Sequence, residues 1–385
     1  MMTHPLPLAR LGIVGGGQLA RMLAPACHAY QVELNILDPL DQSPAAQAAN
    51  GQIVGSLHDA DALSALCEVS DVVTFDLENV GADMLVTLAN QGVRMVPDPA
   101  TVQLIQNKLE QKRHYKTHDI PTTAFEALDE PHALSQVERF GWPCVQKANT
   151  GGYDGRGVHI LHSSADWPNR LLGPSFVEAY VPHATELAVM VATRASGEMV
   201  VYDPVEMVVD PELNLLDYLI APARVPAEIA REAVQLARKT VASFGTPGLF
   251  GVELFVSAGG ELWVNEVAPR AHNSGHHTIE ACVTSQFENQ LRACLDLPLG
   301  QTDLRAHALT MNLVGADGFE GRPVIEGLKW VSGLPDVHVH LYGKASCRPG
   351  RKMGHLTLLG QDHSGLIERA NQIREQLFIR GEQPI

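Results

Sequence analysis

Two glutamates, Glu253 and Glu266, flank a predicted β-hairpin at a spacing that suits a metal site. The dipeptide Gly259–Gly260 between them is typical of a two-residue hairpin turn. If these glycines form the turn, counting back along both strands places the glutamates directly opposite each other, where like charges destabilise a sheet. A cation between them would remove that repulsion, and with Asn265 beside them the oxygen ligands favour Mg²⁺ bound to nucleotide phosphates. The alternative is a slipped register with one solvated carboxylate.

A glycine-rich loop directly follows a lysine. Residues 147–157 read Lys-Ala-Asn-Thr-Gly-Gly-Tyr-Asp-Gly-Arg-Gly, after an apolar strand-like segment at 143–146. Glycine permits the positive φ angles that turn successive amides toward an anion, and Lys147 would add a point charge for phosphate. The loop therefore predicts a phosphate cover, although a flexible surface turn is the alternative. The P-loop pattern G-x-x-x-x-G-K-[ST] is absent from the sequence.

A second glycine-rich turn lies near the start of the chain. Residues 15–20 form G-x-G-x-x-A between a predicted strand and a predicted helix, and Asp38 ends the next predicted strand. This arrangement is found in dinucleotide sites, where the acidic residue binds a ribose. The same turn also serves other anionic ligands at a helix N-terminus, or a purely structural role. An NAD(P)-dependent oxidoreductase is thus one hypothesis to test.

A polar segment, Ala268–His277, follows the hairpin and precedes a predicted helix. Its residues Arg270, His272 and Asn273 could hold a small oxyanion. Two alternatives are a solvated loop and a zinc site formed by the histidines of the segment, for which no acidic or thiol partner stands at ligand spacing. Those histidines are His272, His276 and His277.

Charge and composition narrow the class of protein. The 385 residues include 28 Lys and Arg against 44 Asp and Glu, a net charge of −16 that would repel a nucleic-acid backbone. Against this acidic background, Arg348, Arg351 and Lys352 place three cations within five residues, which favours binding of a phosphate monoester. The hydrophobic fraction of 45% is that of a globular enzyme or binding protein.

Targeting signals are not evident. No apolar run reaches the roughly 18 residues of a membrane-spanning helix, and Met1–Ala9 lacks a signal-peptide pattern, so we expect a cytoplasmic protein. Six scattered cysteines form no C-x-x-C pair, so neither a disulfide framework nor a zinc site is predicted.

The hydrophobic pattern indicates an α/β and α+β protein of two or three domains. The first hundred residues alternate strands and helices, which is typical of a parallel sheet. We expect an N-terminal Rossmann-like domain at 1–100, a central domain at 101–300 and a small β-rich domain at 301–385. The predicted strands are 11–14, 32–37, 72–75, 93–96, 308–314, 337–342 and 354–359, and the predicted helices are 18–28, 82–90, 99–117, 226–244, 278–296 and 364–377.

Four segments give the chain a close resemblance to a known family. They are Thr150–Gly157, Asn265–Glu266, Pro269–His276 and Arg348–Leu356, and the match extends over nearly the whole sequence. The chain resembles the 5-(carboxyamino)imidazole ribonucleotide synthases of purine biosynthesis, which belong to the ATP-grasp superfamily. The resemblance implies a pre-ATP-grasp domain, an ATP-grasp domain and a small C-terminal domain in a homodimer. It implies ATP, Mg²⁺, bicarbonate and 5-aminoimidazole ribonucleotide as ligands.

The resemblance also assigns roles to individual residues. For ATP they are Lys108, Lys147, Gly152, Tyr153, Asp154, Gly155, Arg156, Gly157, Val158, Glu178, Ala179, Tyr180, Val181, Glu186, Asn265 and Glu266, with Glu253, Asn265 and Glu266 as Mg²⁺ ligands. For the ribonucleotide and bicarbonate they are Gln18, Leu19, Glu78, Tyr153, Arg156, Arg270, His272, Asn273, Ser274, Lys344, Arg348, Arg351 and Lys352. Asp154, as base or orienting group, Arg270 and Lys352 are the catalytic candidates.

One departure from the family and three rival functions remain. Relatives usually carry a histidine in an Asn-x-His context where this chain has Glu206–Asp210, so we expect Asp210 or a nearby polar residue to replace its contact to ATP. The rivals are the oxidoreductase, an ATP-grasp module without turnover, and a formate-using formyltransferase, against which the long match at 269–276 argues.

Overall fold

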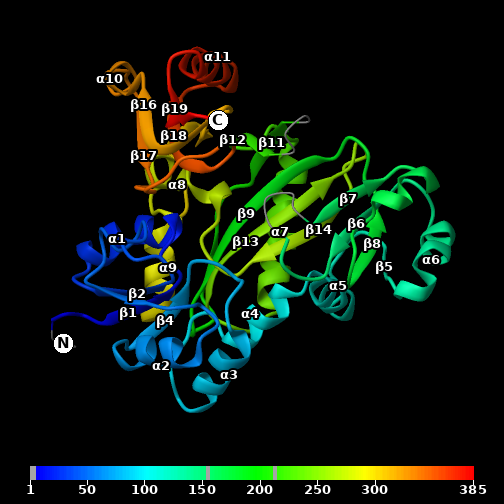
Figure 1. Ribbon diagram of the computed structural model, residues 1–385, viewed down its shortest axis with the longest axis horizontal. Coiled ribbons are helices and arrows are strands. Elements are labelled where there is room, and N and C mark those ends of the chain that lie inside the picture. The colour runs from blue at the N-terminus through cyan, green and yellow to red at the C-terminus, as the bar shows by residue number, and fades with distance from the viewer. Residues whose placement is uncertain (1–5, 153–156, 211–214) are drawn as a thin grey trace.

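The computed structural model describes residues 6–152, 157–210 and 215–385. The N-terminal part is a parallel sheet in the order β3-β2-β1-β4, as the alternating pattern predicted (Figure 1). Its strands are buried on both faces. Leu11 and Ile13 of β1 pack toward α1 and α9 (Gln286–Leu295), while Val14 packs toward α2 and α3. The elements of this part are β1 (Arg10–Val14), α1 (Gln18–Ala29), β2 (Glu33–Asp38), β3 (Gly51–Val54), α2 (Ala60–Glu68), β4 (Val72–Phe75) and α3 (Ala82–Asn90).

The prediction of a strand at 93–96 is wrong. Only Met95 forms a bridge, to Val73 of β4. Pro97 and Pro99 follow at once, and because proline lacks the N–H that a sheet ladder needs, the chain leaves the sheet there.

Two predicted helices are each broken in two. The first divides into α4 (Pro99–Gln106) and α5 (Lys108–Thr117) at Asn107, whose extended backbone lets its side chain accept hydrogen bonds from the first amides of α5. The second divides into α8 (Thr278–Ala281) and α9 (Gln286–Leu295), and Ser285 caps α9 in the same way. The first break places Lys108 at the start of α5, facing the hairpin glutamates.

Most of the remaining strands form one large sheet. Among the described residues it has nine strands in the order β14-β13-β9-β11-β12-β15-β18-β17, with β10 paired to β9. The strands expected in the small C-terminal domain, β15, β17 and β18, therefore continue the central sheet. Its elements are β9 (Thr185–Thr193), β10 (Met199–Val201), β11 (Val205–Asp210), β12 (Leu215–Ala221), α7 (Ala227–Ala242), β13 (Gly248–Val256), β14 (Leu262–Ala268), β15 (His307–Val314), β17 (Val337–Leu341) and β18 (Lys352–Gly360).

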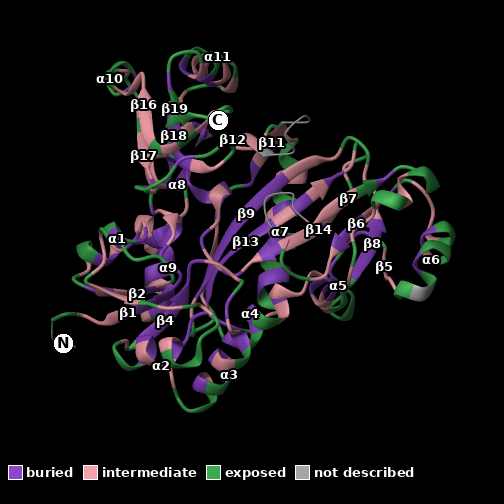
Figure 2. Cartoon of the chain, in the orientation of Figure 1, coloured by how far each residue is buried: buried purple, intermediate pink, exposed green. Residues whose placement is uncertain are grey.

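Two smaller sheets complete the described part of the fold. One has the order β5-β8-β6-β7 and the other pairs β16 with β19. Figure 2 shows the buried residues running along β9 and β13, and α9 lies between these strands and the N-terminal sheet. The elements are β5 (Phe125–Ala127), α6 (Ala133–Phe140), β6 (Cys144–Ala148), β7 (Val158–Leu161), β8 (Ser175–Ala179), β16 (Phe319–Glu326), α10 (Leu328–Val331), α11 (His363–Arg374) and β19 (Phe378–Pro384). No helix in the described ranges is both long and apolar enough to cross a membrane.

Gly15 is confined by its surroundings. Its φ is +99°, and an added Cβ would meet the Leu77 side chain and lie 2.9 Å from the Asp76 Cβ. Gly92 has the same φ with nothing within 4 Å of an added Cβ. We expect Gly92→Ala to lower the free energy of unfolding by about 1–2 kcal/mol through backbone strain, and Gly15→Ala by about 1–3 kcal/mol more through overpacking. Urea unfolding of both variants measures the difference, and equal losses would contradict it.

Candidate active site

One cavity of about 910 Å³ lies where the N-terminal sheet, the β13–β14 hairpin and the C-terminal segment meet. Strands β1 and β4 end at this cavity, α5 begins at it, and the segment after β14 runs along it. It therefore brings together residues up to 335 positions apart, from Gly17 to Lys352. The predicted site residues among its lining are Gln18, Leu19, Glu78, Lys108, Gly152, Glu266, Arg270, His272, Asn273, Lys344, Arg348, Arg351 and Lys352.

Glu253 and Glu266 are directly opposite each other, but the predicted turn register is wrong. Near the turn Val256 pairs with Leu262 and the Ser257 amide bonds to the Glu261 carbonyl, so three residues, not two, form the turn. A bulge then inserts Asn265 into β14 and shifts the register by one, which restores the predicted pairing.

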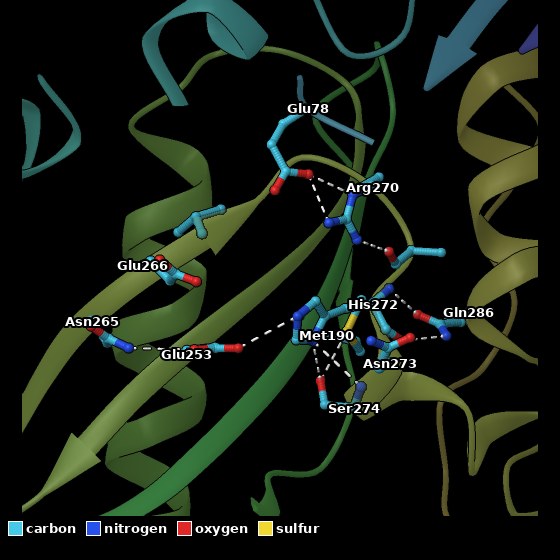
Figure 3. Close-up of polar contacts among 12 residues, drawn as sticks. Glu78, Met190, Glu253, Asn265, Glu266, Arg270, His272, Asn273, Ser274 and Gln286 are labelled. Carbon is cyan, nitrogen blue, oxygen red and sulfur yellow. Dashed lines mark hydrogen bonds and ion pairs between the residues drawn. The ribbon is translucent and has the colours of Figure 1, made fainter. Parts of the chain in front are cut away.

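The bulge also turns Asn265 toward its neighbours. Its Nδ2 donates to Glu253 Oε2 at 3.3 Å (Figure 3). Its Oδ1 accepts from Lys147 Nζ at 2.8 Å. Lys108 Nζ forms an ion pair with Glu266. The predicted oxygen set thus converges, with a lysine at each end.

The two glutamates carry opposite electrostatic shifts. Burial, followed by the charge of Glu266, raises the pKa of Glu253. Burial also opposes ionisation of Glu266, but Lys108 and Lys147 outweigh it and hold the pKa of Glu266 below its usual range. The pair therefore lacks positive charge on the Glu253 side, which is where a cation would be stabilised.

A buried cluster beside the hairpin joins Glu178 to two lysines. Lys112 Nζ lies 2.7 Å from Glu178 Oε2, and Lys147 Nζ lies 2.5 Å from Glu178 Oε1. Burial alone would raise the pKa of Glu178, but the two lysines hold it far below its usual range. Burial lowers the pKa of Lys112 to about 8, which leaves it mainly protonated at neutral pH. The sequence did not predict a role for Lys112, because nothing in a helix rich in Lys, Gln and Glu marks one lysine as buried.

Arg270 and His272 lie on the other side of the hairpin glutamates (Figure 3). Arg270 donates from Nε and Nη2 to Glu78 Oε2, each at 2.7 Å. The His272 ring lies with Nε2 3.4 Å from Glu253 Oε1 and Nδ1 2.8 Å from the Ser274 hydroxyl. Burial and the charge of Arg270 lower the pKa of His272 to about 4, so the ring is neutral at pH 7.

Supporting contacts hold this segment in place. The Gln286 side-chain amide bonds to both the backbone N–H and the carbonyl of His272. Ser274, predicted at the substrate, is fully buried and bonds to His272 and Met190. These contacts hold the His272 ring in place, and the role of Ser274 at the substrate stays a prediction.

The turn at 15–20 does not have the electrostatics of a dinucleotide site. The amides of Gly17 and Ala20 donate to the Asp76 carboxylate at 3.1 and 2.6 Å. Asp38, the candidate for a ribose, accepts from the amides of Gly16 and Leu40 instead. Because a carboxylate already occupies the N-terminus of α1, a pyrophosphate there would be repelled.

Three family models together match most of the chain. Residues 8–106 match the ribonucleotide synthetase preATP-grasp domain, residues 113–287 the ATP-grasp domain, and residues 308–369 the phosphoribosylaminoimidazole carboxylase C-terminal domain. N5-carboxyaminoimidazole ribonucleotide synthase of Synechococcus elongatus is 37% identical over 377 residues, which cover 96% of this chain and 94% of the relative. The chain belongs to the N5-carboxyaminoimidazole ribonucleotide synthase family.

Solved structures agree with this family. The N5-carboxyaminoimidazole ribonucleotide synthetase of Thermotoga maritima is 39% identical with a TM-score of 0.90, over 97% of this chain and all of that chain. The synthase of Aspergillus clavatus with ADP and 5-aminoimidazole ribonucleotide is 34% identical with a TM-score of 0.85, over 95% and 97%. The expected family and the expected pre-ATP-grasp, ATP-grasp and C-terminal architecture are confirmed.

Other described residues predicted from the synthase family are not among the residues that line the cavity. Glu178 and Ala179 end β8, Tyr180 and Val181 follow them, and Val158 begins β7 after Gly157. Glu186 lies on β9 between Phe255 and Met207 in register. Tyr153, Asp154, Gly155 and Arg156 lie outside the described residues.

The segment that departs from the synthase family pattern forms β11. Its Glu206 is ion-paired with Arg224 at 2.6 Å, and its Met207 is the register neighbour of Glu186. Asp210 ends the strand, and its side chain is outside the described part. The expected replacement of the missing histidine stays a prediction.

In this member of the synthase family, stacked histidines connect the segment after β14 to strands β17 and β18. His276 stacks on His355 with ring centroids 4.4 Å apart, and His355 stacks on His340 at 4.5 Å. Tyr342 Oη lies 2.9 Å from His355 Nδ1, and His340 Nε2 lies 2.6 Å from Glu280 Oε1. These contacts hold β17 and β18, of which β18 begins at Lys352, against the segment that carries Arg270. The three histidines considered above as zinc ligands have different partners. His276 stacks on His355, and His277 Nδ1 lies 3.1 Å from the Ser274 carbonyl oxygen.

The histidine stack predicts acid sensitivity. Burial, followed by the neighbouring imidazoles, lowers the pKa of His276 and His355 well below 6.5. Below about pH 6.5 the unfolded chain binds protons that the folded chain does not, so stability falls by up to about 1.4 kcal/mol per pH unit for each histidine. We expect urea unfolding at pH 7.5 and 5.5 to show this loss, and His355→Gln to reduce it. The exposed His58→Gln variant is the control, and a pH-independent free energy of unfolding would contradict the prediction.

Proposed function

We propose that this protein carboxylates the exocyclic amine of 5-aminoimidazole ribonucleotide, using ATP and bicarbonate. The observation that carries the proposal is the single cavity that Lys108 and Glu266 share with Arg270 and Lys352. Groups suited to phosphoryl binding thus lie beside groups suited to a small oxyanion and a phosphate monoester. The relatives with ATP, and with ADP and 5-aminoimidazole ribonucleotide, support the same ligands.

The chemistry needs charge neutralisation and exclusion of water. Bicarbonate is a poor electrophile, and attack of its oxygen on the ATP γ-phosphorus expels ADP and forms carboxyphosphate. Loss of phosphate then delivers CO₂ to the amine nitrogen, which forms the C–N bond and releases a proton. Lys108 and Lys147 would neutralise the transferring phosphoryl group, and Arg270 would stabilise the carboxyl oxygens.

The residues present fit a magnesium ion. Glu253, Asn265 and Glu266 supply hard oxygen ligands, and burial, followed by the negative charge of Glu266, raises the pKa of Glu253. Among the described residues no group of three acidic, histidine or cysteine side chains forms a closed metal site. Phosphate oxygens would complete the coordination, as is usual for Mg²⁺ with nucleotides. The ion would polarise the γ-phosphoryl group.

The other functional assignments belong to the same proposal. Gln18, Leu19 and Glu78 would bind the ribonucleotide, with its phosphate on Lys344, Arg348, Arg351 and Lys352. His272 and Asn273 would bind bicarbonate with Arg270. Asp154 would accept or orient the amine proton. We also retain the domain limits 1–100, 101–300 and 301–385 and the homodimer as proposals.

The test is coupled ADP release with Mg·ATP and bicarbonate, with and without 5-aminoimidazole ribonucleotide. We expect ribonucleotide-dependent turnover and incorporation of ¹³C-bicarbonate into a carbamate detected by NMR. Absence of ribonucleotide-dependent turnover despite ATP binding would reject the substrate, and turnover with formate would favour the formyltransferase.

A further inference from the structure

Glu178 is held by two lysines that reach different oxygens of its carboxylate. Lys112 pairs with Oε2 at 2.7 Å and Lys147 with Oε1 at 2.5 Å. The exposed fractions of the three side chains are 2% for Glu178, 2% for Lys112 and 8% for Lys147. A carboxylate this deeply buried is strongly destabilising without a cation, so at least one of the lysines must remain paired with it.

The two lysines differ in what else they contact. Lys112 donates to the hydroxyls of Thr122 and Thr123 at 2.7 and 3.0 Å as well as to Glu178. These three acceptors use all three N–H donors of an ammonium group, so Lys112 has none for a ligand. Lys147 contacts Glu178 and Asn265, which among the described residues leaves one donor for a further partner.

The strand register gives the two lysines different positions. Val145 of β6 pairs with Glu178 of β8, so Lys147, two residues later, lies on the same face as Glu178. The opposite face, with Gln146 and Val177, packs on α6. Lys147 therefore stands at the end of β6, where the glycine-rich loop begins, whereas Lys112 approaches Glu178 from α5.

We propose that Lys112 is a positioning residue for nucleotide binding, because it keeps a positive charge on Glu178 and so frees Lys147 to turn to the phosphates of a nucleoside di- or triphosphate. This rests on the proposed function only in taking Lys147 as a phosphate contact. Without Lys112, Glu178 would have Lys147 as its remaining cation, and a phosphate would have to compete with a buried carboxylate for it. Lys112 thus acts through Glu178 and never touches the nucleotide.

A double-mutant cycle tests this coupling. The variants are Lys112→Met, Glu178→Gln and the double variant, with the exposed Lys116→Met on the same helix as the matched control. Isothermal titration calorimetry with Mg·ADP measures the dissociation constant of each. We expect Lys112→Met to weaken binding roughly tenfold or more, the size of one charged hydrogen bond, and Lys116→Met to leave it unchanged.

The decisive comparison is between the two backgrounds. The double variant should bind Mg·ADP within about threefold of Glu178→Gln alone, because no carboxylate then retains Lys147. A purely structural role of Lys112, or direct contact with the nucleotide, would weaken binding in both backgrounds and overturn the proposal. An unchanged dissociation constant for Lys112→Met would also overturn it. If Lys112→Met does not fold, the comparison of Glu178→Gln with the double variant still decides.

Failure of the proposed function would be recognised separately. Calorimetry with Mg·ADP needs no acceptor substrate, whereas the proposed function is tested by ribonucleotide-dependent ADP release in the unmodified protein. The KM values of Lys112→Met give a second readout, since the KM for ATP should rise while the KM for 5-aminoimidazole ribonucleotide stays the same. Equal increases in both KM values would indicate general disruption of the cavity and reject the positioning role.

Discussion

Replacing Glu266 with glutamine is expected to lower kcat for ribonucleotide-dependent ADP release by roughly 10³-fold. Glu266 faces Glu253 across the hairpin and is ion-paired with Lys108. Its carboxylate would therefore be shared between the proposed metal and the lysine proposed to bind phosphate. Glutamine keeps the shape but removes the charge. A metal contributes several kcal/mol to stabilisation of a transferring phosphoryl group, and each 1.36 kcal/mol is a factor of about ten in rate.

The control for this variant is Glu261→Gln, which removes an exposed carboxylate from the same hairpin. It should retain the turnover of the unmodified protein. Raising the Mg²⁺ concentration should partly restore binding of ATP to Glu266→Gln but not to Glu261→Gln, which has no deficit. If Glu266→Gln turns over ATP at the normal rate, the hairpin does not hold the catalytic metal.

Replacing Arg270 with lysine is expected to lower kcat by about 10²–10³-fold, the cost of removing one preorganised donor to an oxyanion. The Arg270 guanidinium donates to Glu78 from Nε and Nη2 and to the Ala271 carbonyl from Nη1, which fixes its plane beside His272 (Figure 3). Lysine retains the charge but is a point donor without the planar fork. Because the substitution leaves the net charge unchanged, we attribute the expected loss of kcat to the lost geometry of the guanidinium donors.

The matched control is Arg231→Lys, at an exposed ion pair with Glu228 on α7. Steady-state kinetics with varied bicarbonate and varied ribonucleotide will separate the possible roles. A lowered kcat would place Arg270 at the reacting carboxyl group. An unchanged kcat with a higher KM for the ribonucleotide alone would show instead that Arg270 only binds substrate.

Local signals in the sequence predicted most of the N-terminal domain and the residue types of the site. The glycine turn at 15–17, the hairpin glutamates and the cations at 348–352 were all visible as patterns. The helix breaks at Asn107 and before Ser285 were missed, because a capping side chain inside a polar helical pattern has the same hydrophobic period as an unbroken helix. The predicted two-residue turn of the β13–β14 hairpin was also wrong. The bulge at Asn265 nevertheless restores the predicted pairing of Glu253 with Glu266.

The sequence by itself determined the family and which charged residues are candidates for binding a phosphate. Only the tertiary structure decided how those charges are paired. It buries Lys112 against Glu178, satisfies the amides of the α1 turn with Asp76, and continues the C-terminal strands into the central sheet. The physical reason is that hydrophobic period and turn chemistry act over a few residues, whereas burial of a charge depends on elements brought together from distant parts of the chain.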